Sequence, residues 1–310
     1  MEFINGVTFA PFSKKGMFEG ENVRKSFDQM IEGTGANFVI FVPTGYQDTP
    51  QSEDIIFRGQ DNVADEELIE MIHYAHEKGI RVALKPTVNC KNGTWRAHIN
   101  FFDEDVPCEP KWSNWFASYT AFQCHYAAIA QAENCEMFIA GCEMVQTQRR
   151  EKEWRKLISD IRAIYHGPVS YNTDKYQEHN VKWWDAVDVI SSSGYYPIDD
   201  WENQLDRIEP VVKKFGKPFF FAECGCMATE GSSKIPNDWG LDGDFNMQEQ
   251  ADWYEAMFKA CKKRDWVEGF CLWSWSDKPE TMDEALSNRF YEICHKPAEK
   301  VVKEAYSSNN

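Results

Sequence analysis

Two glutamates stand directly after strongly apolar runs, where a carboxylate needs a physical reason. Glu143 ends the run FIAGCE, and Glu223 ends the run FFFAE. Burying an unpaired carboxylate is strongly unfavourable. Each glutamate must therefore lie at an opening, be paired, or take part in chemistry.

Hydrolysis of a glycosidic bond by an enzyme typically uses two carboxyl groups that face each other. In a retaining enzyme they lie about 5–5.5 Å apart, whereas about 6.5–9.5 Å suits inversion. One group, protonated, gives its proton to the departing sugar oxygen, and the other, ionised, attacks the anomeric carbon. Repulsion and different surroundings push the two pKa values apart, so one pair can hold both states at one pH. Solvated or salt-bridged glutamates are the alternative interpretation.

Strands and helices alternate along the whole chain. We predict strands at 7–11, 36–43, 80–88, 136–143, 167–173, 187–196, 217–223 and 267–276. We predict helices near 21–33, 64–79, 112–132, 150–165, 180–185, 201–215, 247–264 and 297–306. The strand interiors are continuous apolar runs, which is typical of parallel strands covered on both faces. Eight such units in 310 residues predict an α/β fold, a (β/α)8 TIM barrel, as a single domain over residues 1–310.

This fold would bring the two glutamates together. They close the fourth and seventh predicted strands, which lie on roughly opposite sides of a barrel mouth. The strand-to-helix joins are long, as at 88–111 and 224–246, whereas the join at Gly79–Ile80 is short. We therefore expect the working face at the carboxyl ends of the strands.

The net charge and the cysteine content limit which classes of binding partner and which cellular location we expect. The formal net charge of −17 argues against nucleic acid and against anionic membranes, since binding to phosphates depends on positive charge. No apolar run reaches the roughly 20 residues needed to cross a bilayer. Ten cysteines without a signal-like segment after Met1 favour a reduced, cytoplasmic protein. A secreted protein whose signal had been removed would look the same. We expect a monomer.

Aromatic residues complete a pattern that resembles a known family. Tyr195 ends the sixth predicted strand in SSSGYY, and Trp273 lies in LWSW at the end of the eighth. With Glu143 and Glu223, this ordered set resembles clan A of the glycoside hydrolases, and most nearly family 113, the β-1,4-mannanases. The resemblance covers essentially the whole chain.

The resemblance implies a role for each of the four residues. Glu143 would be the general acid/base and Glu223 the nucleophile, with retention at the anomeric centre. Tyr195 would donate a hydrogen bond to Glu223, and Trp273 would lie beneath the sugar ring at the scissile bond. Tyr196 and Trp275 compete for the two aromatic positions. For any one of these aromatic residues, core packing is an equally good explanation.

Two positions depart from the pattern of many clan members. Cys142 stands where many have asparagine to hold the sugar 2-hydroxyl, and a thiol is a poor hydrogen-bond partner. Mannose carries that hydroxyl axially, so Cys142 mildly favours mannosides. The arginine that many place near the nucleophile is missing from FVPTGYQ, and Lys85 is our candidate for the positive charge. A solvated or ion-paired lysine is the alternative.

Further polar residues point to the same mouth. Asn89, Trp95 and Arg96 in the loop NCKNGTWRAHINFF, and Asn172 at the end of the fifth strand, are candidate sugar-binding residues. Loop solvation or turn chemistry explains any one of them equally well.

We expect neither a metal nor another cofactor. HxH, HExxH and CxxC are missing, although Cys224 and Cys226 beside Glu223 offer a weak alternative. The predicted function is a retaining endo-β-1,4-mannanase with mannan or β-linked manno-oligosaccharide as partner. The alternatives are a clan relative acting on other β-linked glycans (a β-mannosidase, glucanase or xylanase) and a non-catalytic carbohydrate-binding barrel.

Overall fold

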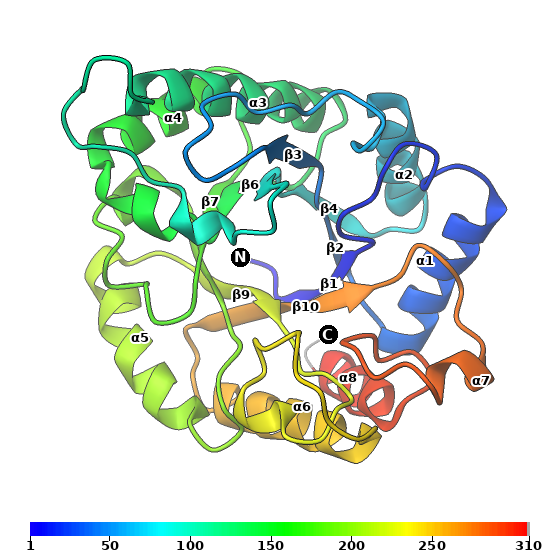
Figure 1. Ribbon diagram of the computed structural model, residues 1–310. Coiled ribbons are helices and arrows are strands. Elements are labelled where there is room, and N and C mark those ends of the chain that lie inside the picture. The colour runs from blue at the N-terminus through cyan, green and yellow to red at the C-terminus, as the bar shows by residue number, and fades with distance from the viewer. Residues whose placement is uncertain (309–310) are drawn as a thin grey trace.

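Eight parallel strands close into a barrel, and helices surround it (Figure 1). The computed structural model describes residues 1–308. The strand order around the barrel is β1, β2, β4, β6, β7, β8, β9 and β10, and β10 pairs with β1. The bounds are Ile4–Phe9 (β1), Phe38–Phe41 (β2), Arg81–Leu84 (β4), Met137–Cys142 (β6), Val169–Thr173 (β7), Val189–Ser193 (β8), Phe219–Cys224 (β9) and Val267–Trp275 (β10). The predicted (β/α)8 TIM barrel is confirmed.

The helices follow the predicted positions, except that the one near 180–185 does not form and the short helix Met282–Ala285 was not predicted. They are Glu21–Thr34 (α1), Asp65–Glu77 (α2), Trp112–Ala132 (α3), Glu151–Arg162 (α4), Trp201–Phe215 (α5), Met247–Cys261 (α6), Met282–Ala285 (α7) and Pro297–Ser307 (α8). Short 3-10 turns cover Arg96–His98 (η1), Val145–Arg149 (η2), Trp184–Ala186 (η3) and Ser232–Lys234 (η4). Within residues 1–308, no helix has the length and apolar character needed to cross a membrane.

The short helix predicted near 180–185 is wrong, because only the turn η3 forms there. Trp183 and Trp184 are fully buried, and their indole N–H groups donate to the backbone carbonyls of Gln148 and Glu178. These side-chain hydrogen bonds fix the segment against the barrel in place of a helical ladder.

Alternation along the strands divides the core into two layers. Phe220 and Ala222 belong to the apolar cluster inside the barrel, together with Ile4, Phe38, Ile40, Val42, Ala83, Met137, Ile139, Val189 and Cys271. Phe219 and Phe221 belong to the larger cluster between the strands and the helices. The apolar side chains before Glu223 therefore pack on both faces of the barrel wall, as expected for a strand of a parallel sheet.

Two short strands extend beyond the barrel wall. The strand predicted at 80–88 is divided in two, and an additional strand follows the one predicted at 36–43. β3 (Thr44–Gln47) and β5 (Thr87–Cys90) form a separate parallel pair, which follows β2 and β4 along the chain. Pro43 and Pro86 stand at the two interruptions and lack the N–H that a continuous ladder needs. This small ribbon carries the chain outward. Asn89, predicted in a loop, lies in β5, and the ribbon positions the loop with Trp95 and Arg96 that follows it.

A register shift near the end of β9 turns Glu223 inward. The pairing of β8 with β9 moves from Ser192–Phe221 to Ser193–Glu223, so Ala222 is an additional residue in β9. Such a bulge re-aims the side chain that follows it. Without it, Glu223 would share the outward face of Phe219 and Phe221.

Glu143 receives its direction from backbone geometry at the end of β6. Glu143 has a φ of 53°, and Gly141, two residues before it, has a φ of 98°. A Cβ at Gly141 would lie 2.2 Å from the Tyr119 hydroxyl, so only glycine fits that position. Non-glycine residues with positive φ cluster at functional sites, and Glu143 is one of them.

Candidate active site

The two glutamates meet inside the mouth of the barrel. One carboxylate oxygen from each of Glu143 and Glu223, together with the Cys142 sulfur, lies within 4.8 Å of the others. Glu143 is 7% exposed and Glu223 is 5% exposed. Carboxyl groups this close are typical of a retaining pair, at about 5–5.5 Å, whereas an inverting pair is typically about 6.5–9.5 Å apart.

Glu223 is held at both of its oxygens. Its Oε1 accepts hydrogen bonds from Lys85 Nζ and, at 3.1 Å, from Cys142 Sγ. Its Oε2 accepts from the Tyr195 hydroxyl at 3.0 Å. Burial is the largest single influence and raises the pKa of Glu223, but the charge and hydrogen bond of Lys85, the Arg96 charge and the Cys142 hydrogen bond together outweigh it and hold that pKa below its ordinary value. Glu223 is therefore an ionised, fixed carboxylate.

Glu143 receives three different donors. Ser193 Oγ donates to Oε1 at 2.8 Å. Arg96 donates to Oε2 at 3.0 Å, and the indole N–H of Trp95 donates to the same oxygen at 3.2 Å. Arg96 lies in the loop after β5 and Ser193 lies at the end of β8, so the hydrogen bonds to Glu143 come from two different sides of the barrel opening.

The ribbon formed by β3 and β5 places Arg96. The Arg96 guanidinium donates to Asn89 Oδ1 at 2.8 Å and to the Val88 carbonyl at 3.0 Å, and both acceptors lie in β5. Asn89 thus orients Arg96 rather than facing Glu143 itself. Trp95 is 42% exposed and also lies under the Lys175 ammonium, which is 6.0 Å from a Trp95 ring centroid. It is the exposed aromatic surface on the Glu143 side.

Burial and contacts distinguish the neighbouring aromatic residues. Trp273 is half-buried beside the mouth, with Lys85 Nζ 5.8 Å from its ring centroid. Trp275 is buried and donates to Ser26, and Tyr196 is fully buried and donates to Glu178. The structure thus places Trp273 and Tyr195 at the mouth, and Trp275 and Tyr196 in the core.

All ten predicted site residues lie around this mouth, but several contact the protein's own carboxylates. Cys142 and Lys85 contact Glu223, and Lys85 also donates to Asn172 Oδ1 at 3.1 Å. Cys142 is 1% exposed, so its thiol faces the nucleophile candidate and not open space. The roles of these residues toward a sugar stay predictions.

Two polar residues of the site were missed by sequence reasoning. Ser193 is one of three consecutive serines, and nothing in that run distinguishes it from its neighbours. Asp174 follows β7 and is buried; burial and the Glu143 charge raise the pKa of Asp174 to about 7, against the opposing effect of Lys175. A carboxylate directly after the fifth strand was the available signal for Asp174.

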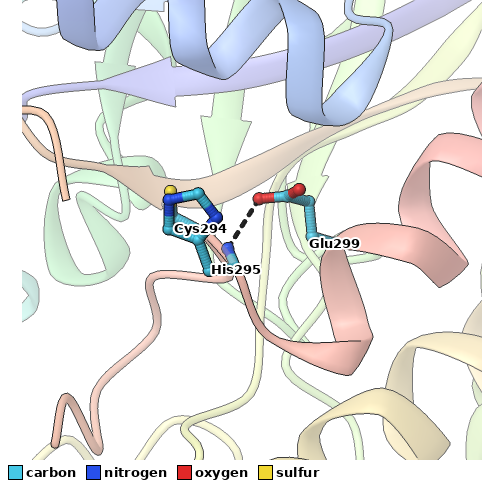
Figure 2. A group of neighbouring side chains, drawn as sticks. All are labelled: Cys294, His295 and Glu299. Carbon is cyan, nitrogen blue, oxygen red and sulfur yellow. Dashed lines mark hydrogen bonds between the residues drawn. The ribbon is translucent and has the colours of Figure 1, made fainter. Parts of the chain in front are cut away.

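Within residues 1–308, two groups of side chains have donor atoms close enough to hold a metal ion. The first is Cys142 with the two glutamates, where burial and the Glu223 charge raise the pKa of the thiol well above its ordinary value and keep it protonated. The second is Cys294, His295 and Glu299 at the start of α8 (Figure 2). There Glu299 accepts a hydrogen bond from the His295 backbone N–H at 2.7 Å, which ties down the beginning of the helix.

The alternative metal position near Cys224 and Cys226 is not supported by the contacts of the described residues. Cys224 Sγ lies 3.7 Å from the Cys271 carbonyl, and Cys226 Sγ lies 3.4 Å from Ser232 Oγ. Neither sulfur joins Glu223 in a group of candidate ligands among residues 1–308.

Comparison with known proteins identifies the relatives of this site. The family model of Glycoside Hydrolase Family 113 matches residues 7–296. A solved family 113 β-1,4-mannanase is 55% identical with a TM-score of 0.98, and the match covers 99% of this chain and all of that chain. The family 113 β-mannanase AaManA from Alicyclobacillus acidocaldarius, solved in complex with ManMIm, is 39% identical with a TM-score of 0.97 over 100% of this chain and 99% of that one.

More distant matches share the fold alone. A β-glucuronidase from Ruminococcus gnavus is 14% identical with a TM-score of 0.65, over 98% of this chain and 50% of that chain. A search of curated proteins found no match. The family match and the two mannanase structures together span the barrel and its mouth, and the chain is therefore a glycoside hydrolase that belongs to Glycoside Hydrolase Family 113.

Proposed function

We propose that this glycoside hydrolase is a β-1,4-mannanase that acts on mannan or manno-oligosaccharides by double displacement, with retention. The observation that carries the proposal is the pair Glu143 and Glu223, whose oxygens approach within 4.8 Å. The solved relatives at 55% and 39% identity are mannanases, which supports mannose-based substrates over other β-linked glycans.

In the first step Glu223 attacks the anomeric carbon. Lys85, Cys142 and Tyr195 hold its carboxylate in place. A bond forms between this carbon and a Glu223 oxygen, and the bond to the leaving oxygen breaks. The leaving oxygen takes the proton of Glu143, so no charged alkoxide is released.

In the second step water attacks the same carbon from the side of Glu143. Glu143 takes a proton from the water, the ester bond to Glu223 breaks, and both carboxyl groups return to their starting states. Two inversions give net retention. The covalent ester supplies the activation, so the chemistry requires no cofactor.

Sugar rings would lie on aromatic surfaces on either side of the glutamates. Trp273 is beside Lys85 and Glu223, which suits the sugar that becomes attached to Glu223. Trp95 is half exposed beside Glu143, which suits the leaving sugar. Aromatic faces bind the apolar side of a pyranose ring without fixing its hydroxyls.

Product analysis tests the proposal. We expect mannopentaose to be cleaved to shorter manno-oligosaccharides, while xylopentaose and cellopentaose stay intact at the same enzyme concentration. Faster cleavage of another glycan would contradict the mannan assignment, and tight binding of oligosaccharides without hydrolysis at any pH would favour a binding protein. A cytoplasmic location and a monomeric state stay predictions, tested by cell fractionation and by light scattering.

A further inference from the structure

A continuous chain of hydrogen bonds joins the two glutamates beneath the mouth. Ser193 Oγ donates to Glu143 Oε1 at 2.8 Å and accepts from Asn172 Nδ2 at 3.1 Å. Asn172 Oδ1 accepts from Lys85 Nζ at 3.1 Å, and Lys85 also donates to Glu223. Lys85, Asn172 and Ser193 are all 0% exposed, so water does not compete for these contacts.

The chemistry of the groups fixes the direction of the chain. An ammonium can only donate, so the Asn172 oxygen must face Lys85 and the Asn172 amide nitrogen must face Ser193. The Ser193 oxygen accepts from that amide, and its own proton then points to Glu143. Every link donates away from Lys85 toward Glu143, and hydrogen bonds arranged in this way polarise one another.

The double displacement changes the charge at one end of this chain. In the free enzyme the negative charge of Glu223 balances Lys85. When Glu223 forms the ester with the sugar, its charge disappears and the buried Lys85 charge loses its partner. The positive end of the chain then acts more strongly on Glu143, which has given its proton to the leaving oxygen and must stay ionised until it takes a proton from the attacking water.

We propose that Ser193 is a positioning residue that links the charge of Glu223 to the protonation of Glu143. The link rests on the proposed double displacement. Ser193 orients the Glu143 carboxyl group in both steps and favours the ionised form of Glu143 in the second step.

Other charged and titratable groups also face Glu143. They are Lys85 and Arg96, Cys142 beside Glu143, Tyr171 and Asp174 on β7 and its loop, and Tyr195, Glu223 and Tyr291. Lys175 lies next to Asp174 and over the Trp95 ring. Of these, Glu223 alone changes its covalent state during turnover. Direct repulsion from Glu223 also disappears in the ester, so loss of Ser193 should weaken the link and not abolish it.

The test compares pH profiles of two steps in Ser193→Ala. The first profile is kcat/KM for mannopentaose, which reports the free enzyme. The second is kcat for 2,4-dinitrophenyl β-mannobioside, where a burst of dinitrophenolate shows that hydrolysis of the ester limits the rate. The matched control is Ser191→Ala, because Ser191 is also buried on β8 but donates to the Tyr171 carbonyl at 2.9 Å.

We expect the acidic limb of ester hydrolysis to move upward by about one pH unit in Ser193→Ala, which is what one hydrogen bond to a charged group contributes. The profile of the free enzyme should move less, and Ser191→Ala should leave both profiles in place. Equal shifts of both profiles, no shift, or the same shift in Ser191→Ala would overturn the link. If Ser193→Ala does not fold, Ser193→Cys, a weaker donor of similar shape, must give a shift in the same direction. A wild-type enzyme that leaves mannopentaose intact would instead refute the proposed function.

Discussion

Replacing Lys85 by methionine removes the charge that balances the buried Glu223. The side chain of Lys85 is 0% exposed and that of Glu223 is 7% exposed, so solvent cannot take over the lost interaction. Breaking a buried ion pair by deleting one partner costs about 3–5 kcal/mol in the free energy of unfolding. We expect a loss of that size for Lys85→Met at pH 8, measured by urea unfolding with tryptophan fluorescence.

The pH dependence of this loss should have a definite sign. In the wild type the pKa of Glu223 is lowered, so Glu223 stabilises the fold above the ordinary carboxyl pKa of about 4.3 and this contribution is lost as pH falls. Without Lys85, burial is the largest remaining effect and raises the pKa of Glu223. The variant should therefore lose stability as pH rises above about 4.3, the opposite slope.

Two further variants separate the buried pair from a general effect of losing a lysine. The side chains of Lys14 and Asp61 form an ion pair and are 56% and 65% exposed. Lys14→Met should therefore change the free energy of unfolding by at most about 1 kcal/mol, and this change should not depend on pH. Lys85→Met with Glu223→Gln should recover most of the loss, because no unpaired charge stays buried. A Lys85→Met protein within about 1 kcal/mol of the wild type at pH 8 would refute the reasoning.

The remaining predictions concern catalysis. Tyr195→Phe loses the hydrogen bond to Glu223 Oε2 at 3.0 Å, so kcat/KM for mannopentaose should fall about 10- to 150-fold; an unchanged value would contradict the role of Tyr195. With 2,4-dinitrophenyl β-mannobioside and azide, Glu223→Ala should yield the α-glycosyl azide and Glu143→Ala the β-glycosyl azide, as NMR of the products would show. The reverse pairing would exchange the roles of the two glutamates. Trp95→Ala should raise KM for mannopentaose roughly tenfold while Trp95→Phe, which keeps a ring, raises it less; equal effects would exclude stacking.

Residues could be predicted from the sequence where the type of the residue is unusual for its position or where the chemistry requires that type. Glu143 and Glu223 were recognisable because a carboxylate after an apolar run demands an explanation, and the barrel followed from repeated buried strands. Lys85 was expected near the nucleophile because a positive charge was missing elsewhere. The structure brings each of these residues to the mouth.

The contacts beneath the mouth could not be predicted from the sequence. Strict alternation would have turned Glu223 outward with Phe221, and the bulge at Ala222 that reverses it depends on pairing with β8. Ser191, Ser192 and Ser193 are identical in type, and their contacts differ because they occupy different faces and heights of one strand. The prolines that separate the β3–β5 ribbon from the barrel are visible in the sequence, but the hydrogen bonds from Arg96 to Val88 and Asn89 of β5 are not.

The direct test of the central claim is to trap the covalent intermediate with 2-deoxy-2-fluoro-β-mannosyl fluoride and to map the label by mass spectrometry. The fluorine at C2 slows both steps, while the fluoride leaving group lets the ester form and accumulate. We expect a single fluoromannosyl group on the peptide that contains Glu223 and none on the peptide that contains Glu143. A label on Glu143, or no label in a protein that cleaves mannopentaose, would contradict the assignment of Glu223 as the attacking carboxylate.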